Sequence, residues 1–104
     1  MIQSKFYCNV KAFNAVEREN YKALTQKLHM ARLEVVETEQ GYRFRLDPSK
    51  ISVADVANWV TAESKCCPFF NFQVERAGEG KELSMRLTGD EGVKPFIRSE
   101  FRLR

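Results

Sequence analysis

Hydrophobic and polar positions recur along this chain with two different periods, which predict helices and strands in turn. Apolar residues return at helical spacing over 15–30, after Asn14 and a glutamate three positions later that together form a capping-box pattern. A second amphipathic segment follows Ser52, which can cap a helix with Asp55 in its first turn. This helix should end before Pro68, because proline disfavours helical geometry in the residue before it. Two amphipathic helices are therefore expected.

Other segments alternate with a period of two, as half-buried strands do. Turn residues, Glu39-Gln40-Gly41 in one case and a glycine-rich stretch at 77–80 in the other, separate neighbouring alternating segments and predict two hairpins. The expected strands are 6–10, 33–38, 42–46, 70–74 and 83–87. A short closing helix is expected over 93–101, with Pro95 tolerable only in its first turn.

This order of elements predicts an α+β fold, with an antiparallel sheet of about five strands and helices on one face. Written out, it is β-α-β-β-α-β-β-α within a single domain, which suits a chain of 104 residues. The helix-hairpin units 14–41 and 52–78 are similar in length, and Phe44-Arg45-Leu46 is similar to Met85-Arg86-Leu87. We therefore consider an internal αββ duplication.

Composition and charge restrict the classes of protein to which the chain can belong. The chain is 43% hydrophobic and 30% charged, has no apolar run of the roughly 20 residues that a membrane helix needs, and begins without a secretory pattern. A cytoplasmic protein of bacterial type, with reduced thiols, is the expectation. The net charge of +3 is mild, and Glu34, Glu37 and Glu39 precede the small cluster of Arg43 and Arg45, which argues against nucleic-acid binding.

The cysteines are the most informative candidate chemistry. Two of the three in the chain, Cys66 and Cys67, are adjacent at the end of the second expected helix, and Cys8 lies on the apolar side of the first expected strand. A thiolate is the chain's softest ligand and its strongest nucleophile. Buried cysteine is also an ordinary core residue, so a core role stays open.

Two motifs carry a resemblance to a known group of proteins. They are Glu63-x-x-Cys66-Cys67-Pro68-Phe69 and Leu87-Thr88-Gly89-x-Glu91-Gly92-Val93-Lys94. With them, nearly the whole chain resembles small bacterial proteins of unassigned function that carry a CCPF double-cysteine signature and are sometimes associated with mercury-responsive-type regulators or heavy-metal resistance genes. The chain departs from that pattern at Lys65, where arginine is usual, and at Pro95, where an acidic residue is usual. The resemblance implies a soft-metal or thiol role for Cys8, Cys66 and Cys67.

The thiol pattern suits a soft ion better than zinc. Three sulfurs without a fourth partner match a trigonal site for mercury, arsenite or a cuprous ion, whereas zinc would need an accessory ligand such as Glu63 or His29. Adjacent helical residues point about 100° apart. Cys66 and Cys67 can therefore share an ion only if the chain leaves the helix at this point, as Pro68 favours.

Two other functions stay open. One is a structural or interaction module, such as a homodimer, with its cysteines in the core and an aromatic face formed by Trp59, Phe69, Phe70 and Phe72. The other is a thiol enzyme, which the negative end of the helix dipole disfavours.

Glu63 either holds a proton near the thiols or pairs with an arginine. A vicinal disulfide would be strained, because consecutive Cα atoms are only about 3.8 Å apart.

Overall fold

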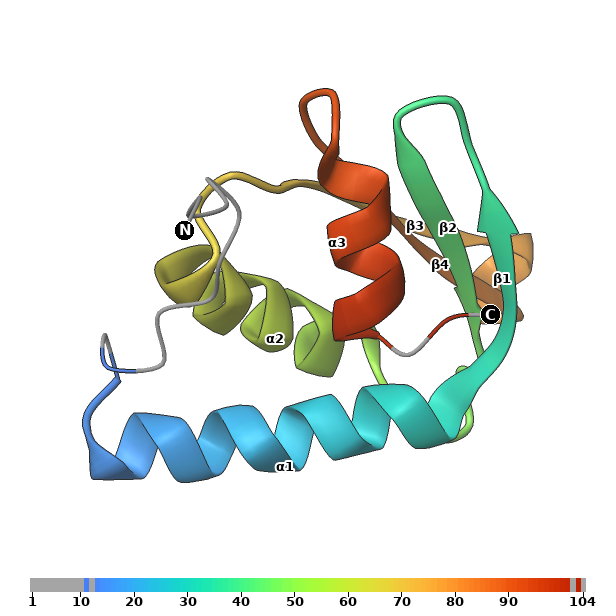
Figure 1. Cartoon of the computed structure of the whole chain (residues 1–104). Helices are drawn as coiled ribbons and strands as arrows, with labels where there is room; N and C mark the ends of the chain where they lie inside the picture. Colours follow the sequence, from blue (N-terminus) through green and yellow to red (C-terminus); the bar gives the residue numbers. More distant parts are fainter. Residues whose placement is uncertain (1–10, 12, 102, 104) are drawn as a thin grey trace.

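The computed structural model describes residue 11, residues 13–101 and residue 103. Helices and strands follow one another in two helix-hairpin units and a closing helix (Figure 1). In chain order they are α1 (Ala15–Ala31), β1 (Arg32–Glu37), β2 (Gly41–Leu46), α2 (Val53–Cys66), β3 (Asn71–Ala77), β4 (Glu82–Thr88) and α3 (Val93–Glu100).

Both long helices begin at the predicted capping boxes. The Asn14 side chain accepts a hydrogen bond from the Glu17 amide at 2.8 Å, and the Glu17 carboxylate accepts one from the Asn14 amide at 3.0 Å. Ser52 and Asp55 make the same reciprocal pair at 3.0 and 3.2 Å. These contacts satisfy amide groups that the first helical turn would otherwise leave without partners.

The sheet is antiparallel throughout, in the order β1-β2-β4-β3, which confirms the α+β class. Four strands are described, against about five expected; the expected strand 6–10, with Cys8, lies outside the described residues. The two hairpins meet through β2 and β4, where Phe44 pairs with Met85. This central pairing aligns the two helix-hairpin units side by side.

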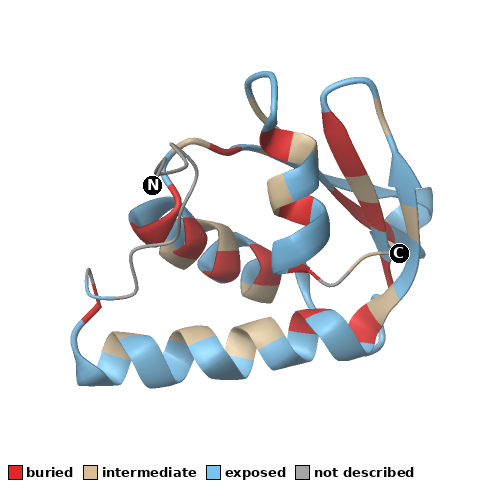
Figure 2. Cartoon of the chain, in the orientation of Figure 1, coloured by how far each residue is buried: buried red, intermediate tan, exposed pale blue. Residues whose placement is uncertain are grey.

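One face of the sheet is buried under the helices and the other is open (Figure 2). Alternate residues of the central strands form the buried face: Tyr42, Phe44, Leu46, Leu83, Met85 and Leu87. α2 and α3 pack against the sheet, and α1 packs along α2. Trp59 of α2 is fully buried, lies edge-on to Phe72 and Phe101, and donates a hydrogen bond to the Thr25 hydroxyl at 3.0 Å.

The aromatic rings belong to this core. Among the described phenylalanines, four are buried and three are half-buried; they are Phe13, Phe44, Phe70 and Phe101, then Phe69, Phe72 and Phe96. Phe69 and Phe70 pack edge-to-face with a centroid distance of 4.7 Å. The expected aromatic face of Trp59, Phe69, Phe70 and Phe72 is therefore core packing, because these rings contact α2, α3 and one another. No helix in the described part of the chain is long and apolar enough to span a membrane.

Candidate metal centre at the end of helix α2

The site begins where α2 ends. Cys66 is the last residue of the helix, and Cys67 has φ −129° and ψ 71°, outside helical geometry. The Cys67 amide still donates to the Glu63 carbonyl, at 2.6 Å, so the break comes after this bond. The chain leaves the helix at the position that Pro68 predicts.

This break brings the two sulfur atoms together. The Sγ atoms of Cys66 and Cys67 are 3.6 Å apart. Together with one carboxylate oxygen of Glu63, one helical turn earlier, they form a group in which all three candidate ligand atoms lie within 4.8 Å of one another. All three side chains are fully buried. The structure thus brings together three of the residues that the sequence nominated.

Glu63 is held by the first helix. The Tyr21 hydroxyl donates a hydrogen bond to Glu63 Oε2 at 2.7 Å, linking α1 to α2. The pKa of the Glu63 carboxyl is raised from 4.5 to about 7: burial raises it most, the Tyr21 hydrogen bond lowers it, and the charge of Glu100 raises it. Arg43, Arg45 and Arg86 project from the other face of the sheet, so the arginine pairing considered for Glu63 is not formed with them.

The same burial suppresses thiolate formation at Cys66. Desolvation, reinforced by the charge of Glu63, raises the pKa of the Cys66 thiol to about 12. Burial and Glu63 also raise the pKa of the Tyr21 hydroxyl well above its usual value. Cys66 is therefore protonated at neutral pH, which argues against a nucleophilic role. A bound metal ion can displace such a proton, because its charge stabilises the thiolate.

The two adjacent cysteines differ in oxidation state. Cys66 is a free thiol, whereas Cys67 is disulfide-bonded. The separation of 3.6 Å between their sulfurs exceeds the bond length of about 2.05 Å, so they do not form a vicinal disulfide. The expectation of reduced thiols is not met at Cys67. Coordination by its sulfur therefore requires that this disulfide first be reduced.

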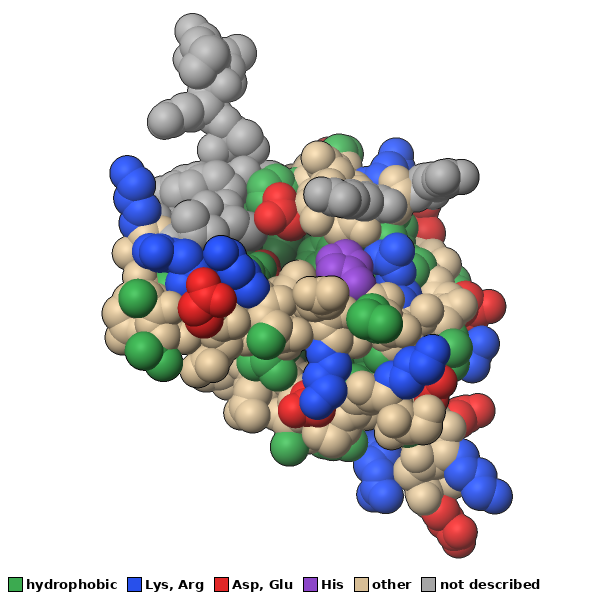
Figure 3. Space-filling view, turned by 90° about the horizontal axis from the view of Figure 1, so that it is seen from below, with side chains coloured by type: hydrophobic (Ala, Val, Ile, Leu, Met, Phe, Trp, Pro, Cys, Tyr) green, Lys and Arg blue, Asp and Glu red, His purple; other side chains and the backbone are tan. Residues whose placement is uncertain are grey.

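The other nominated ligands lie elsewhere. His29 is exposed in the last turn of α1, with its ring 6.3 Å from that of Phe101, and is not among the grouped ligand atoms (Figure 3). Cys8 lies outside the described residues. The described candidate set is therefore Cys66, Cys67 and Glu63.

A cavity of ≈ 500 Å³ opens between α1 and α2, and its volume lies within the range of about 300–1,000 Å³ that is usual for small-molecule sites. Tyr21 lines it while donating to Glu63, so this side chain separates the cavity from the buried carboxyl. Lys65, which replaces the usual arginine before the cysteine pair, forms an ion pair with Glu17 at 2.7 Å between the two helices. Tyr21 was not nominated from the sequence; its signal was its place on the apolar stripe of α1, three and seven residues before Leu24 and Leu28.

Comparison of the chain with protein-family models, with curated proteins and with solved structures gave no match. The resemblance to CCPF proteins stays a prediction. The function must therefore be argued from the site itself.

Proposed function

We propose that the protein, once Cys67 is reduced, binds a soft metal or metalloid ion through Cys66 and Cys67 and serves in metal sensing or resistance. The observation that supports this most directly is the 3.6 Å separation of the two sulfurs in a fully buried site. Two thiolates about 2.3 Å from one ion and about 120° apart, as in a trigonal site, lie about 4.0 Å from each other. A shift of a few tenths of an ångström would therefore let both sulfurs reach one ion.

Charge balance favours a divalent or trivalent ion. Two thiolates neutralise a divalent ion when Glu63 holds its proton, which its raised pKa allows near neutral pH. A third anionic ligand, either the Glu63 carboxylate or Cys8 as the sequence predicts, would match trivalent arsenic. In both cases the buried site carries little net charge, which its low-polarity surroundings require.

The test is a metal titration of the reduced protein. A phosphine reductant, which supplies two electrons to open the disulfide, is removed before mercuric ion or arsenite is added. We expect binding of one ion per chain, seen as sulfur-to-metal charge-transfer absorbance and as a mass increase in native mass spectrometry. The variant C66S/C67S should lose this binding, and C8S tests whether a third thiol takes part.

Each serine variant is first checked by circular dichroism, so that lost binding is not confused with lost folding. Mercury or arsenite affinity that is unchanged in the folded C66S/C67S variant would refute the proposal. Binding that survives C8S but not C66S or C67S assigns the ion to the adjacent pair alone.

A second candidate function follows from the complete burial of both cysteines. In an interaction module these thiols would only fill the core, and the protein would act as a homodimer. Labelling of the reduced, native protein with a chromogenic disulfide reagent separates the two proposals. Thiols that stay silent until denaturation, no protection by metal, and a dimer in sedimentation would favour the module.

A further inference from the structure

The open face of the sheet carries two arginines that face each other. Arg43 of β2 is directly opposite Arg86 of β4, at the centre of the sheet. Like charges at opposite positions destabilise an antiparallel pair. Two residues further along β2, Arg45 lies 3.7 Å from Glu34 and is compensated. In the described part of the chain, no ion pair involves Arg43 or Arg86.

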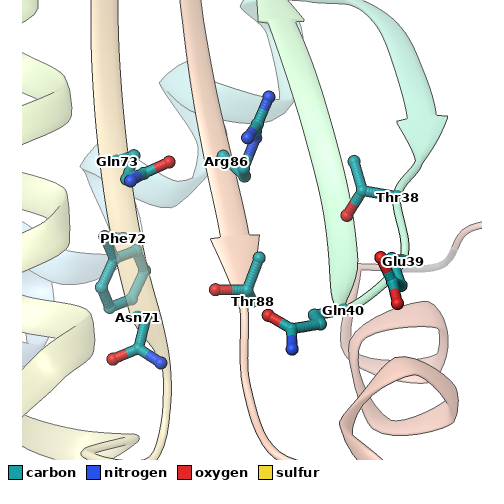
Figure 4. Close-up of a pocket in the computed structure, with 8 residues that line it drawn as sticks. All are labelled: Thr38, Glu39, Gln40, Asn71, Phe72, Gln73, Arg86 and Thr88. Atoms are coloured by element: carbon teal, nitrogen blue, oxygen red, sulfur yellow. The ribbon is translucent and has the colours of Figure 1, made fainter.

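A cavity of ≈ 460 Å³ lies beside this pair, between the β1–β2 turn and the neighbouring ends of β3 and β4. Figure 4 shows the Gln73 carboxamide directed toward the Arg86 strand, and the Gln40 side chain directed toward Thr88 lower in the cavity. Arg86 therefore supplies positive charge to a cavity whose other contacts are mostly amides and hydroxyls.

One group in the cavity lacks a hydrogen-bond partner. The Thr38 hydroxyl oxygen is buried and makes no hydrogen bond within the described residues. Buried hydroxyls are nearly always satisfied, so such a group calls for an explanation. Thr38 lines the same cavity as Arg86. The wall of this ligand-sized space thus includes a residue with a buried, unsatisfied hydroxyl, close to the uncompensated guanidinium of Arg86.

We propose that this cavity binds a small organic anion, with its carboxylate or phosphate group on Arg86, which lines the cavity, and on Arg43, which lies opposite Arg86 on the neighbouring strand. The planar guanidinium binds both groups through paired hydrogen bonds. Gln73, Gln40 and Thr88 would then bind the uncharged part of the ligand. The volume lies within the range of about 300–1,000 Å³ that is usual for small-molecule sites.

Acidic residues around the site favour a small anion over nucleic acid. Glu39 lines the cavity, and Glu34 and Glu75 lie on the same face of the sheet. An extended polyanion would run past these carboxylates, whereas a single anionic group can contact the arginines alone. This site is separate from the cysteines, which lie under the helices on the other face.

The test compares three variants that each remove one positive charge. Inorganic phosphate and acetate are titrated into wild type, R43Q, R86Q and R45Q at physiological ionic strength, and binding is followed by amide shifts in NMR. We expect shifts at 38–41, 71–73 and 86–88, and affinity weakened about tenfold or more in R43Q and R86Q, since a charged hydrogen bond is removed. R45Q, on the same strand and face, should remain within about twofold of wild type.

Stability without ligand provides an independent readout. R86Q should unfold at a higher urea concentration than wild type, because it removes the like-charge pair, whereas R45Q should not. Equal loss of binding in R45Q, or no binding of either probe to wild type, would overturn the proposal. So would a single-stranded oligonucleotide that binds far more tightly than phosphate, because this would make the face a nucleic-acid surface.

Discussion

Replacement of Glu63 by glutamine tests the most unusual feature of the core, a fully buried carboxyl. Glutamine has nearly the same shape, and its amide oxygen can accept the hydrogen bond that Tyr21 now donates to the carboxyl. It cannot ionise. The variant therefore removes the titration of residue 63 while leaving the packing of α1 against α2 largely intact.

The magnitude follows from the raised pKa of Glu63, which moves from 4.5 to about 7 on folding. The folded protein holds this proton more tightly than the unfolded chain, so the stabilisation is complete below pH 4.5 and is lost as the pH rises through 7. Over this interval the wild type loses about 3 kcal/mol of unfolding free energy through this one group. E63Q does not, so its stability relative to wild type should rise by about 3 kcal/mol between pH 4 and pH 8.

The assay is urea denaturation of both proteins at pH 4 and pH 8, followed by tryptophan fluorescence of the buried Trp59. The decisive quantity is how much the difference in unfolding free energy between E63Q and wild type changes from pH 4 to pH 8. Other titrating groups contribute equally to both proteins and cancel in this difference. Groups near Glu63 include Tyr21 from α1, Cys66 from its own helix, the disulfide-bonded Cys67, which does not titrate, and Glu100 at the end of α3. The pKa of Cys66 is about 12, so that thiol does not titrate in this interval.

The refuting result is a difference between E63Q and wild type that is the same at both pH values. It would mean that Glu63 ionises as readily in the folded protein as in the unfolded chain. E63Q could also show the expected change of about 3 kcal/mol with pH while being less stable than expected by the same amount at both pH values. That offset would report an unsatisfied amide hydrogen of glutamine and would leave the pKa argument intact.

Three further predictions concern the same framework. Y21F should destabilise the fold by about 1–3 kcal/mol in urea, because it removes the hydrogen bond from Tyr21 to the buried Glu63 carboxyl. It should also shift the pKa of Glu63 upward in a carboxyl-resolved NMR titration, and an unchanged pKa would contradict this. S52A should cost about 1 kcal/mol through loss of the α2 cap. S99A should change the urea midpoint little, because Ser99 contributes only its backbone carbonyl to the α3 C-cap. Mercuric ion should raise the melting temperature of the phosphine-reduced protein but not of the oxidised one, in which Cys67 is disulfide-bonded; equal shifts would count against coordination by Cys67.

The candidate cysteine site could be predicted in part because its geometry is local. Glu63 and Cys66 are one helical turn apart, and Pro68 ends the helix where Cys67 turns back. Short-range stereochemistry therefore brings the two sulfurs together. Tyr21 could not be assigned to Glu63 in the same way, since 42 positions separate them in sequence. His29, nominated only because its chemistry suits a metal, lies on the exposed side of its helix.

Pairing between segments that are far apart in the chain determined which residues meet on the open face of the sheet. Alternation in 42–46 placed Arg43 on a wet face, and a similar pattern placed Arg86, but nothing local specified that they would be opposite each other. That depends on the antiparallel register of β2 with β4, which aligns Phe44 with Met85. The pairing of like segments at the centre of the sheet is the arrangement expected of two related αββ units, and the duplication stays a prediction.

By itself, the sequence determined the parts of this protein that depend on neighbouring residues: both capped helices, both hairpins and the break after Cys66. Backbone sterics, side-chain capping and hydrophobic periodicity act over a few residues and can be read directly. Only the tertiary structure decided the strand order, the complete burial of Glu63 beneath Tyr21 and the meeting of Arg43 with Arg86. These arise because apolar faces far apart in the chain must be buried against one another, and their packing determines which polar groups come together.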